Sequence, residues 1–278
     1  MNQTVGPHLS LRWMWVLLSI VVAVAACGES ESGGSSTGQP NPAALYGSNI
    51  TTIVVEVDYA TGAEPYIGTS GGDGELWEFF GNHARRMFQA SSTAKTITYP
   101  TMLEEMEELT DLRGQSFTTD AILAIAETHR DQTSSGTTAT FYVVWLDGFF
   151  EDSEGPQESV LGVSLGDTGV IAMFKPVIEG AFGPPALADR INRFVEQTTL
   201  VHEFGHAAGL VNRGVPLTSE HHDADNGAHC TQSDCVMYFA NEGVLDLVDF
   251  VAGVLESGET LTFGDACLAD MDALASGM

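Results

Sequence analysis

The hydrophobic positions of this chain recur with two different periods, which separate the predicted strands from the predicted helices. Runs rich in β-branched and aromatic residues predict strands at 50–59, 96–99, 138–146, 160–165 and 170–174. Apolar positions at helical spacing predict helices at 75–90, 102–110, 119–130 and 263–275, and a long helix that Pro184-Pro185 opens and that passes Ala208. The Gly-Asp-Thr-Gly link before residue 170 predicts a hairpin between the last two strands. This order, with an irregular stretch after the long helix, predicts an α+β fold.

The first residues predict a targeting segment. Arg12 precedes an apolar run from Trp13 to Ala26, about fourteen residues, which is short for a membrane span and typical of a signal peptide. The run ends in Val-Ala-Ala-Cys27-Gly, which resembles the cleavage box of bacterial lipoproteins and implies a lipid on Cys27. We therefore expect a signal peptide over 1–26 and a lipoprotein of the bacterial cell envelope, on the outside of the cytoplasm. An ordinary signal peptide or an N-terminal anchor helix is the alternative.

The composition of the chain predicts where the folded domain begins and which partners are excluded. Polar residues rich in Gly, Ser and Pro predict a flexible tether over 27–45, which leaves 46–278 for the folded domain. The chain has 38 Asp and Glu against 10 Lys and Arg, a formal net charge of −28, and its only lysines are Lys95 and Lys175. Nucleic acid is excluded as a partner, because phosphate backbones are bound by clusters of Lys and Arg. The acidic surface repels copies of itself, and we expect a monomer.

The long predicted helix carries the motif His202-Glu-Phe-Gly-His206. Residues four apart lie one turn apart on one helix face, so both imidazoles reach the same metal ion, and Zn²⁺ is the ion that this pattern favours. Glu203 is offset by about 100° around the helix and addresses a metal-bound water instead of the metal. Two solvated helix histidines are the alternative interpretation. Two histidines leave a zinc site incomplete, because a catalytic zinc takes three protein ligands and one water.

The surrounding sequence resembles that of the metzincin zinc peptidases. In that family a third histidine follows three residues after a glycine that turns the chain; here Gly209 is present, but Asn212, a poor zinc ligand, occupies the later position. His229 opens the string His-Cys-x4-Cys-x-Met, which ends at Met237 and resembles the segment after the glycine in archaemetzincins. The resemblance implies that His229 is the third ligand, that Met237 forms the turn beneath the metal, and that 212–228 is an insertion of 17 residues.

Other third ligands remain open. Four candidates lie in the insertion, namely His221, His222, Asp223 and Asp225. Glu242 is a further candidate, because Asn241-Glu-Gly-Val-Leu-Asp246 resembles the helix of the gluzincins in which a glutamate is the third ligand. In that interpretation Gly209 and the string that begins at His229 have no role.

Three cysteines follow the motif. Cys230 and Cys235 are close in sequence and predicted to be exported, which favours a small disulfide that braces the turn at Met237; a metal-bound pair is the alternative. Archaemetzincins carry a Cys-x-x-Cys pair further downstream that contributes to a second, cysteine-bound zinc. This chain has Cys267 alone in that region, which does not favour a second zinc and leaves Cys267 as a buried thiol or a disulfide partner.

The resemblance also implies an architecture and an activity. It implies a two-lobed zincin, with a mixed twisted sheet and the active-site helix in an upper lobe over about 46–210, and an irregular lower lobe over 211–278 that ends in a helix. The outermost strand, best matched by 160–165, pairs antiparallel with an extended peptide in this family. We therefore expect a zinc-dependent peptidase, an endopeptidase, that hydrolyses peptides or proteins with Glu203 as the general base. A gluzincin-type peptidase, or a zinc-braced binding lipoprotein without activity, is the alternative.

Overall fold

The structure is a computed structural model that describes residues 41–69, 74–89, 91, 93–112, 114–180, 188–239, 247, 251 and 262–277. The chain divides into two compact units, Met1–Glu31 and Ser32–Met278, and the described residues all belong to the second. The predicted signal peptide, Cys27 and most of the predicted tether lie outside the described residues, as does Glu242. Within the described part of the chain, no helix has the length and apolar character needed to cross a membrane.

The centre of the fold is a mixed sheet. Its strands, in spatial order, are β2 (Thr96–Thr98), β1 (Thr52–Ala60), β5 (Thr138–Leu146), β9 (Val170–Phe174) and β8 (Gly162–Ser164), and β3 (Glu107–Leu109) pairs with the end of β1. Neighbouring strands are parallel except for β8, which runs antiparallel to β9 at the edge of the sheet. All five residues of β9 are buried, as expected for a strand covered on both faces. The mixed sheet and its helices agree with the predicted mixture of strands and helices.

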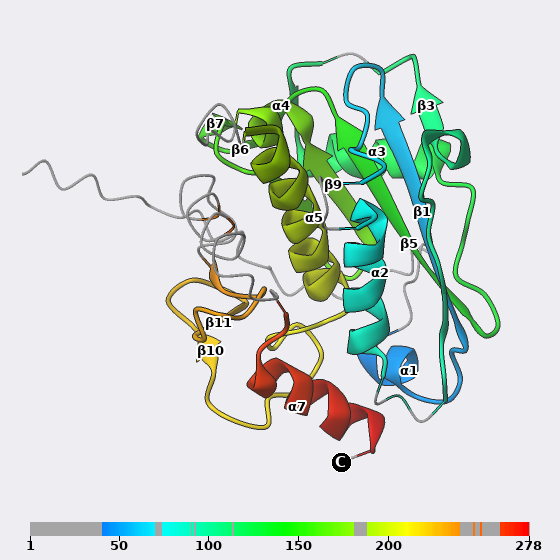
Figure 1. The fold of residues 1–278 in the computed structure, drawn as a ribbon, viewed down its shortest axis with the longest axis vertical. Helices are drawn as coiled ribbons and strands as arrows, with labels where there is room; N and C mark the ends of the chain where they lie inside the picture. Colours follow the sequence, from blue (N-terminus) through cyan, green and yellow to red (C-terminus); the bar gives the residue numbers. More distant parts are fainter. Residues whose placement is uncertain are drawn as a thin grey trace, which may run out of the picture. The chain divides into compact units, whose positions relative to one another are not determined.

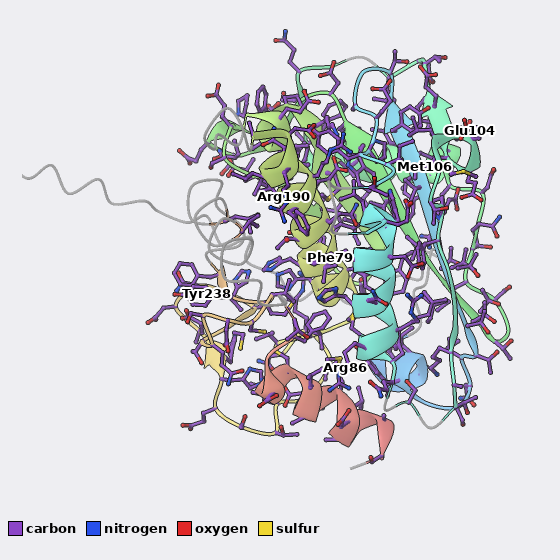
Figure 2. All side chains as sticks on the ribbon, in the orientation of Figure 1. Phe79, Arg86, Glu104, Met106, Arg190 and Tyr238 are labelled. Carbon is purple, nitrogen blue, oxygen red and sulfur yellow. The ribbon has the colours of Figure 1, made fainter. Side chains whose placement is uncertain are left out.

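Helices cover both faces of the sheet. In Figure 1, α2 (Leu76–Met87) and α5 (Ala188–Ala207) lie in front of the strands, and α3 (Thr119–His129) lies behind them. Phe79 of α2 lies between the two front helices (Figure 2), and its ring is edge-on to that of Phe194 of α5, with centroids 6.0 Å apart. Thr118 caps the start of α3, because its hydroxyl accepts a hydrogen bond from the amide of Ala121.

Two parts of the sequence-based prediction were wrong or incomplete. The helix predicted at 102–110 is a 3₁₀ turn, Leu103–Glu105, followed by β3, because Glu107–Leu109 pairs in parallel with Asp58–Ala60 of β1. The long-range pairing outweighs the local helical spacing. The pattern also missed a second small sheet and two short helices: β4 (Ser116–Phe117), β6 (Phe149–Asp152), β7 (Gly155–Gln157), α1 (Pro42–Tyr46) and α4 (Lys175–Glu179).

The chain after α5 is mostly irregular. It forms the short antiparallel pair β10 (His222–Asp223) and β11 (His229–Cys230), and it ends in α7 (Asp265–Ala275), close to the helix predicted at 263–275. Helix α7 contacts α1, whose Leu45 and Tyr46 are buried. The packed part of the chain therefore starts before the boundary predicted at residue 46.

Candidate metal-binding active site

Helix α5 is fixed in rotation by the aromatic residue at the centre of the motif. The ring of Phe204 packs against Phe141 of β5 and Phe80 of α2, with centroids 4.6 and 5.1 Å away. A residue two positions from His202 and from His206 lies on nearly the opposite face of a helix. Anchoring Phe204 in the core therefore directs both histidines away from the sheet, towards the irregular part of the chain.

The chain turns sharply where α5 ends. The amides of Gly209 and Leu210 donate to the last carbonyls of the helix, and Gly209 has a φ of 89°, in the left-handed region that glycine adopts without strain. Val211 and Asn212 follow with φ of 49° and 65°, an unusual conformation for a β-branched residue. The turn sends the chain back beneath the helix, where β11 begins at His229.

Three histidines meet at one point. The Nε2 atom of His206 lies 3.0 Å from Nε2 of His202 and 3.3 Å from Nε2 of His229. All three residues are at least 96% buried, and one ligand atom of each lies within 4.8 Å of the others. The structure therefore brings together the two helix histidines and the third ligand implied by the archaemetzincin resemblance.

Backbone carbonyls hold two of the rings. Nδ1 of His202 lies 2.7 Å from the carbonyl oxygen of Val236, and Nδ1 of His229 lies 2.5 Å from that of Asn226. A carbonyl only accepts, so each Nδ1 carries the proton and each Nε2 presents its lone pair. Such an outer hydrogen bond on a ligating histidine is a regular feature of metal sites. Sequence reasoning missed these two partners, because a backbone carbonyl leaves no mark on residue identity.

The arrangement fits a tetrahedral zinc ion. Nitrogen ligands at about 2.0–2.1 Å from zinc lie about 3.3 Å from one another. The two measured Nε2–Nε2 distances, 3.0 and 3.3 Å, are close to that spacing. Without a cation, lone pairs converging in a buried site repel one another and lose their hydration, so this ligand set needs a positive ion. Three neutral imidazoles leave one tetrahedral position for water, the composition of catalytic zinc sites.

Glu203 lies between the histidines and the sheet edge. It is 3% exposed, and a methyl group placed on Gly162 of β8 would come 3.1 Å from its Cγ atom. Strand β8 therefore passes directly beside the candidate base. This strand pairs with β9 and with no second strand among the described residues, as the sequence predicted for an outermost strand at 160–165.

Met237 packs against the helix between the two histidines. A methyl group placed on Gly205 would come 2.4 Å from the Met237 sulfur, and Met237 itself is fully buried. The glycine within the motif therefore allows the segment that carries Met237 to approach the helix.

The candidate ligands in the insertion lie outside the group of three histidines. Nε2 of His222 donates to the carbonyl of Gly227 at 2.8 Å, and Asp223 accepts a hydrogen bond from the amide side chain of Asn226. His221 contacts Cys230 instead of the three histidines. Among the described residues, the groups able to hold a metal are His202 with His206 and His229, and a second group that includes His221.

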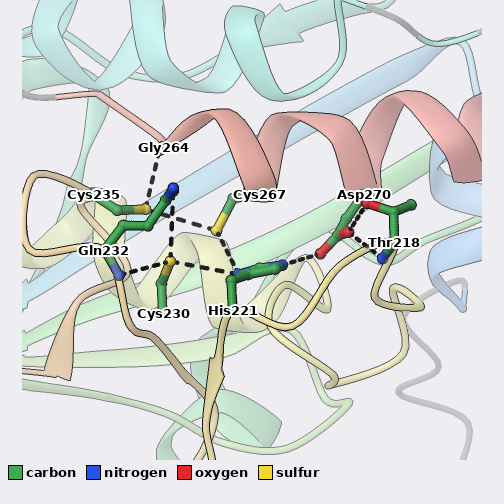
Figure 3. Close-up of polar contacts among 8 residues, drawn as sticks. All are labelled: Thr218, His221, Cys230, Gln232, Cys235, Gly264, Cys267 and Asp270. Carbon is green, nitrogen blue, oxygen red and sulfur yellow. Dashed lines mark hydrogen bonds and ion pairs between the residues drawn. The ribbon is translucent and has the colours of Figure 1, made fainter.

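The predicted disulfide between Cys230 and Cys235 is wrong. Neither residue forms a disulfide, nor does Cys267, and all three are buried. The sulfurs of Cys235 and Cys267 are 3.7 Å apart, and Cys230 lies against His221, so the three side chains gather around a shared centre instead of forming one bond (Figure 3). Hydrogen bonds from the Cys235 and Cys267 thiols hold the pKa of Cys230 well below its usual range.

Known proteins resemble this chain only distantly. No family model matches the chain, and no curated protein matches it in sequence. A solved structure that matches is that of a zinc-dependent peptidase from Methanocorpusculum labreanum strain Z, which covers 78% of this chain and 99% of its own, at 13% identity and a TM-score of 0.39. A similarity of this degree assigns neither a family nor an activity.

Proposed function

We propose that this chain is a zinc-dependent peptidase, with His202, His206 and His229 as the metal ligands. The observation that carries the proposal is the meeting of the three Nε2 atoms in a buried site with a carboxylate one residue along the same helix. A purely structural zinc would have a fourth protein ligand in place of the open position.

Glu203 is the general base in this proposal. A bound zinc ion supplies a Lewis acid that lowers the pKa of water to about 7 and polarises a carbonyl oxygen. The carboxylate takes a proton from the water that attacks the scissile carbonyl, and afterwards gives that proton to the departing amine nitrogen. Burial of Glu203 keeps bulk water from competing for this proton.

The outer edge of β8, which no other described strand covers, is the proposed binding site for the peptide. An extended peptide that pairs with this edge makes backbone hydrogen bonds, which bind any sequence, so specificity would come from side-chain pockets. Gly162 lets this strand pack next to Glu203, because a side chain at this position would come 3.1 Å from the Glu203 Cγ atom. An edge strand that binds the middle of an extended chain suits an endopeptidase.

We propose that the sheet with α5 and the irregular part after it form the two lobes of a metzincin-like zincin, and that the substrate lies between them. Lipidation at Cys27 would hold the enzyme at the bacterial cell envelope. A lipid anchor and an exported acidic domain suit substrates that are peptides or proteins outside the cytoplasm.

Replacement of the base tests the proposal. We expect the purified full chain with zinc to cleave fluorescein-labelled casein, and Glu203→Gln to bind zinc normally while cleavage falls by about 10²–10⁴-fold. Glu127→Gln, a change of the same chemistry at an exposed position of α3, serves as the control and should keep full activity. Undiminished cleavage by Glu203→Gln, or a zinc-loaded wild-type chain that cleaves nothing, would contradict the proposal.

A further inference from the structure

A second cluster of ligand-type side chains lies beside the first. His221, Cys230, Cys235 and Cys267 converge beneath α7, and all four are buried (Figure 3). The sulfurs of Cys235 and Cys267 are 3.7 Å apart. Nδ1 of His221 lies 3.4 Å from the sulfur of Cys230 and 3.9 Å from that of Cys267.

The ligand atoms of His221, Cys230 and Cys267 all lie within 4.8 Å of one another, and Cys235 joins this group through its contact with Cys267. The three separations above are close to those of ligands around one tetrahedral zinc ion. With zinc–sulfur bonds of about 2.3 Å and zinc–nitrogen bonds of about 2.0–2.1 Å, two sulfurs lie about 3.8 Å apart and a sulfur lies about 3.5 Å from a nitrogen. A disulfide would instead place its two sulfurs about 2.05 Å apart. Three cysteines and one histidine are also a regular ligand set of closed, structural zinc sites.

His221 is oriented for metal binding by a buried carboxylate. Its Nε2 atom donates to Oδ2 of Asp270 at 2.7 Å, and Asp270 is 1% exposed. The other carboxylate oxygen accepts from the amide and the hydroxyl of Thr218, at 2.6 and 2.7 Å. With the proton held at Nε2, the lone pair of Nδ1 faces the sulfurs. The carboxylate–histidine–metal arrangement fixes ring orientation in known zinc sites.

Backbone amides face the sulfurs as they do around thiolates. The amide of Gly264 donates to the Cys235 sulfur at 3.0 Å, and the amide of Gln232 donates to the Cys230 sulfur at 3.5 Å. A side chain on Gly264 would come 3.1 Å from the Cβ atom of Cys235, so glycine permits this approach. Donors directed at sulfur stabilise its charged form, which is the form that binds metal.

We propose that His221, Cys230, Cys235 and Cys267 bind a second zinc ion, and that this centre holds the third ligand of the first site in place. The insertion at 212–228 supplies the histidine, which compensates for a downstream cysteine that the sequence lacks. The second metal is structural, since four protein ligands leave no position for water.

The two proposed metal centres are connected by residues that are adjacent in the chain. Cys230 follows His229 directly, and the two form β11, which pairs with His222 and Asp223 next to His221. Cys235 precedes Val236, whose carbonyl accepts the hydrogen bond from His202. Two ligands of the second centre are thus covalent neighbours of the groups that complete and orient the first. This coupling rests on the proposed function, whereas binding of the second zinc does not.

Metal content and cobalt spectra test the second centre. We expect about two zinc ions per full chain, and about one in His202→Ala/His206→Ala. The remaining ion, exchanged for Co²⁺, should give the near-ultraviolet charge-transfer band of thiolate ligands. His221→Ala should bind this ion more weakly, so that the band appears only at a higher Co²⁺ concentration. His221→Cys should restore the affinity, and His222→Ala is the matched control that keeps both metals.

The zinc affinity of the three histidines tests whether the second centre supports the first. We expect His221→Ala to weaken zinc binding at the three histidines by about 10–100-fold, and His221→Cys to restore it. Unchanged affinity in His221→Ala would overturn the coupling. The second centre would be overturned by a wild-type cobalt form without the band, or by thiols that iodoacetamide labels only after reduction. If the band is present and the chain cleaves no peptide, the second centre stands and the proposed peptidase function falls.

Discussion

Gly205 and Met237 are in direct contact, and the contact joins the active-site helix to the chain that runs beneath it. A Cβ atom on Gly205 would lie 2.4 Å from the Met237 sulfur and 3.2 Å from its Cε atom. No side chain fits there unless the methionine or the helix moves. The spacing between the helix and the segment that carries Val236 therefore depends on a glycine in the middle of the zinc motif.

Gly205→Ala should destabilise the protein despite the better helix propensity of alanine. Alanine favours a helix by about 1 kcal/mol over glycine, whereas overpacking a buried site costs about 1–3 kcal/mol. We expect the free energy of unfolding to fall and zinc binding to weaken, measured by urea denaturation and metal titration. In the Met237→Ala background the same change should cost much less. Equal cost in both backgrounds would show that the two residues are not coupled.

Gly162→Ala should slow catalysis without removing the metal. The added methyl group would come 3.1 Å from Cγ of Glu203 and 3.0 Å from Cγ2 of Thr199, so the base has to shift. A misplacement of about 1 Å at a reacting group costs about 10²-fold in rate, so this smaller shift should cost a smaller factor. We expect kcat to fall while the zinc content stays at the wild-type value. Wild-type kcat would mean that β8 does not position Glu203.

His229→Ala should lower the zinc affinity of the first site by several orders of magnitude, because a buried ligand is lost from a set of three. His222→Ala and Glu242→Ala should bind zinc as the wild type does. The comparison separates the two peptidase families that the sequence resembles. Normal zinc in His229→Ala together with loss in Glu242→Ala would support the gluzincin-type site.

Asp58 should make the stability depend on pH. It is 2% exposed, and burial raises its pKa to about 6, although Tyr142 donates a hydrogen bond to it. The folded chain holds this proton more tightly than the unfolded chain, so the stabilisation is complete below about pH 4 and is lost as the pH rises to about 6. We expect the stability difference between wild type and Asp58→Asn, both without metal, to change by about 2 kcal/mol between pH 4 and 7. A constant difference would contradict the shifted pKa.

Local patterns in the sequence were sufficient for the main elements. Strand β5 coincides with the run of apolar residues at 138–146, and the link before residue 170 forms the predicted hairpin of β8 and β9. The two histidines of α5 follow from helical spacing alone. These features depend on residues close to one another in the chain, which is why a single sequence reveals them.

The sequence could not show what depends on distant partners. Strand β3 exists because it pairs with the end of β1, and the carbonyls that hold His202 and His229 belong to residues of any type. The cysteines were misjudged for the same reason. His221 and Cys267 are 46 positions apart, and only the fold places them together with Cys230.

The most direct test of the three-histidine zinc site is the anomalous scattering of a crystal of the zinc-loaded full chain, measured on both sides of the zinc absorption edge. We expect a peak at about 2.0–2.1 Å from the Nε2 atoms of His202, His206 and His229, with Glu203 outside the bonding distance. A map with no peak between these three nitrogens, or with the zinc bound to Glu203, would contradict it.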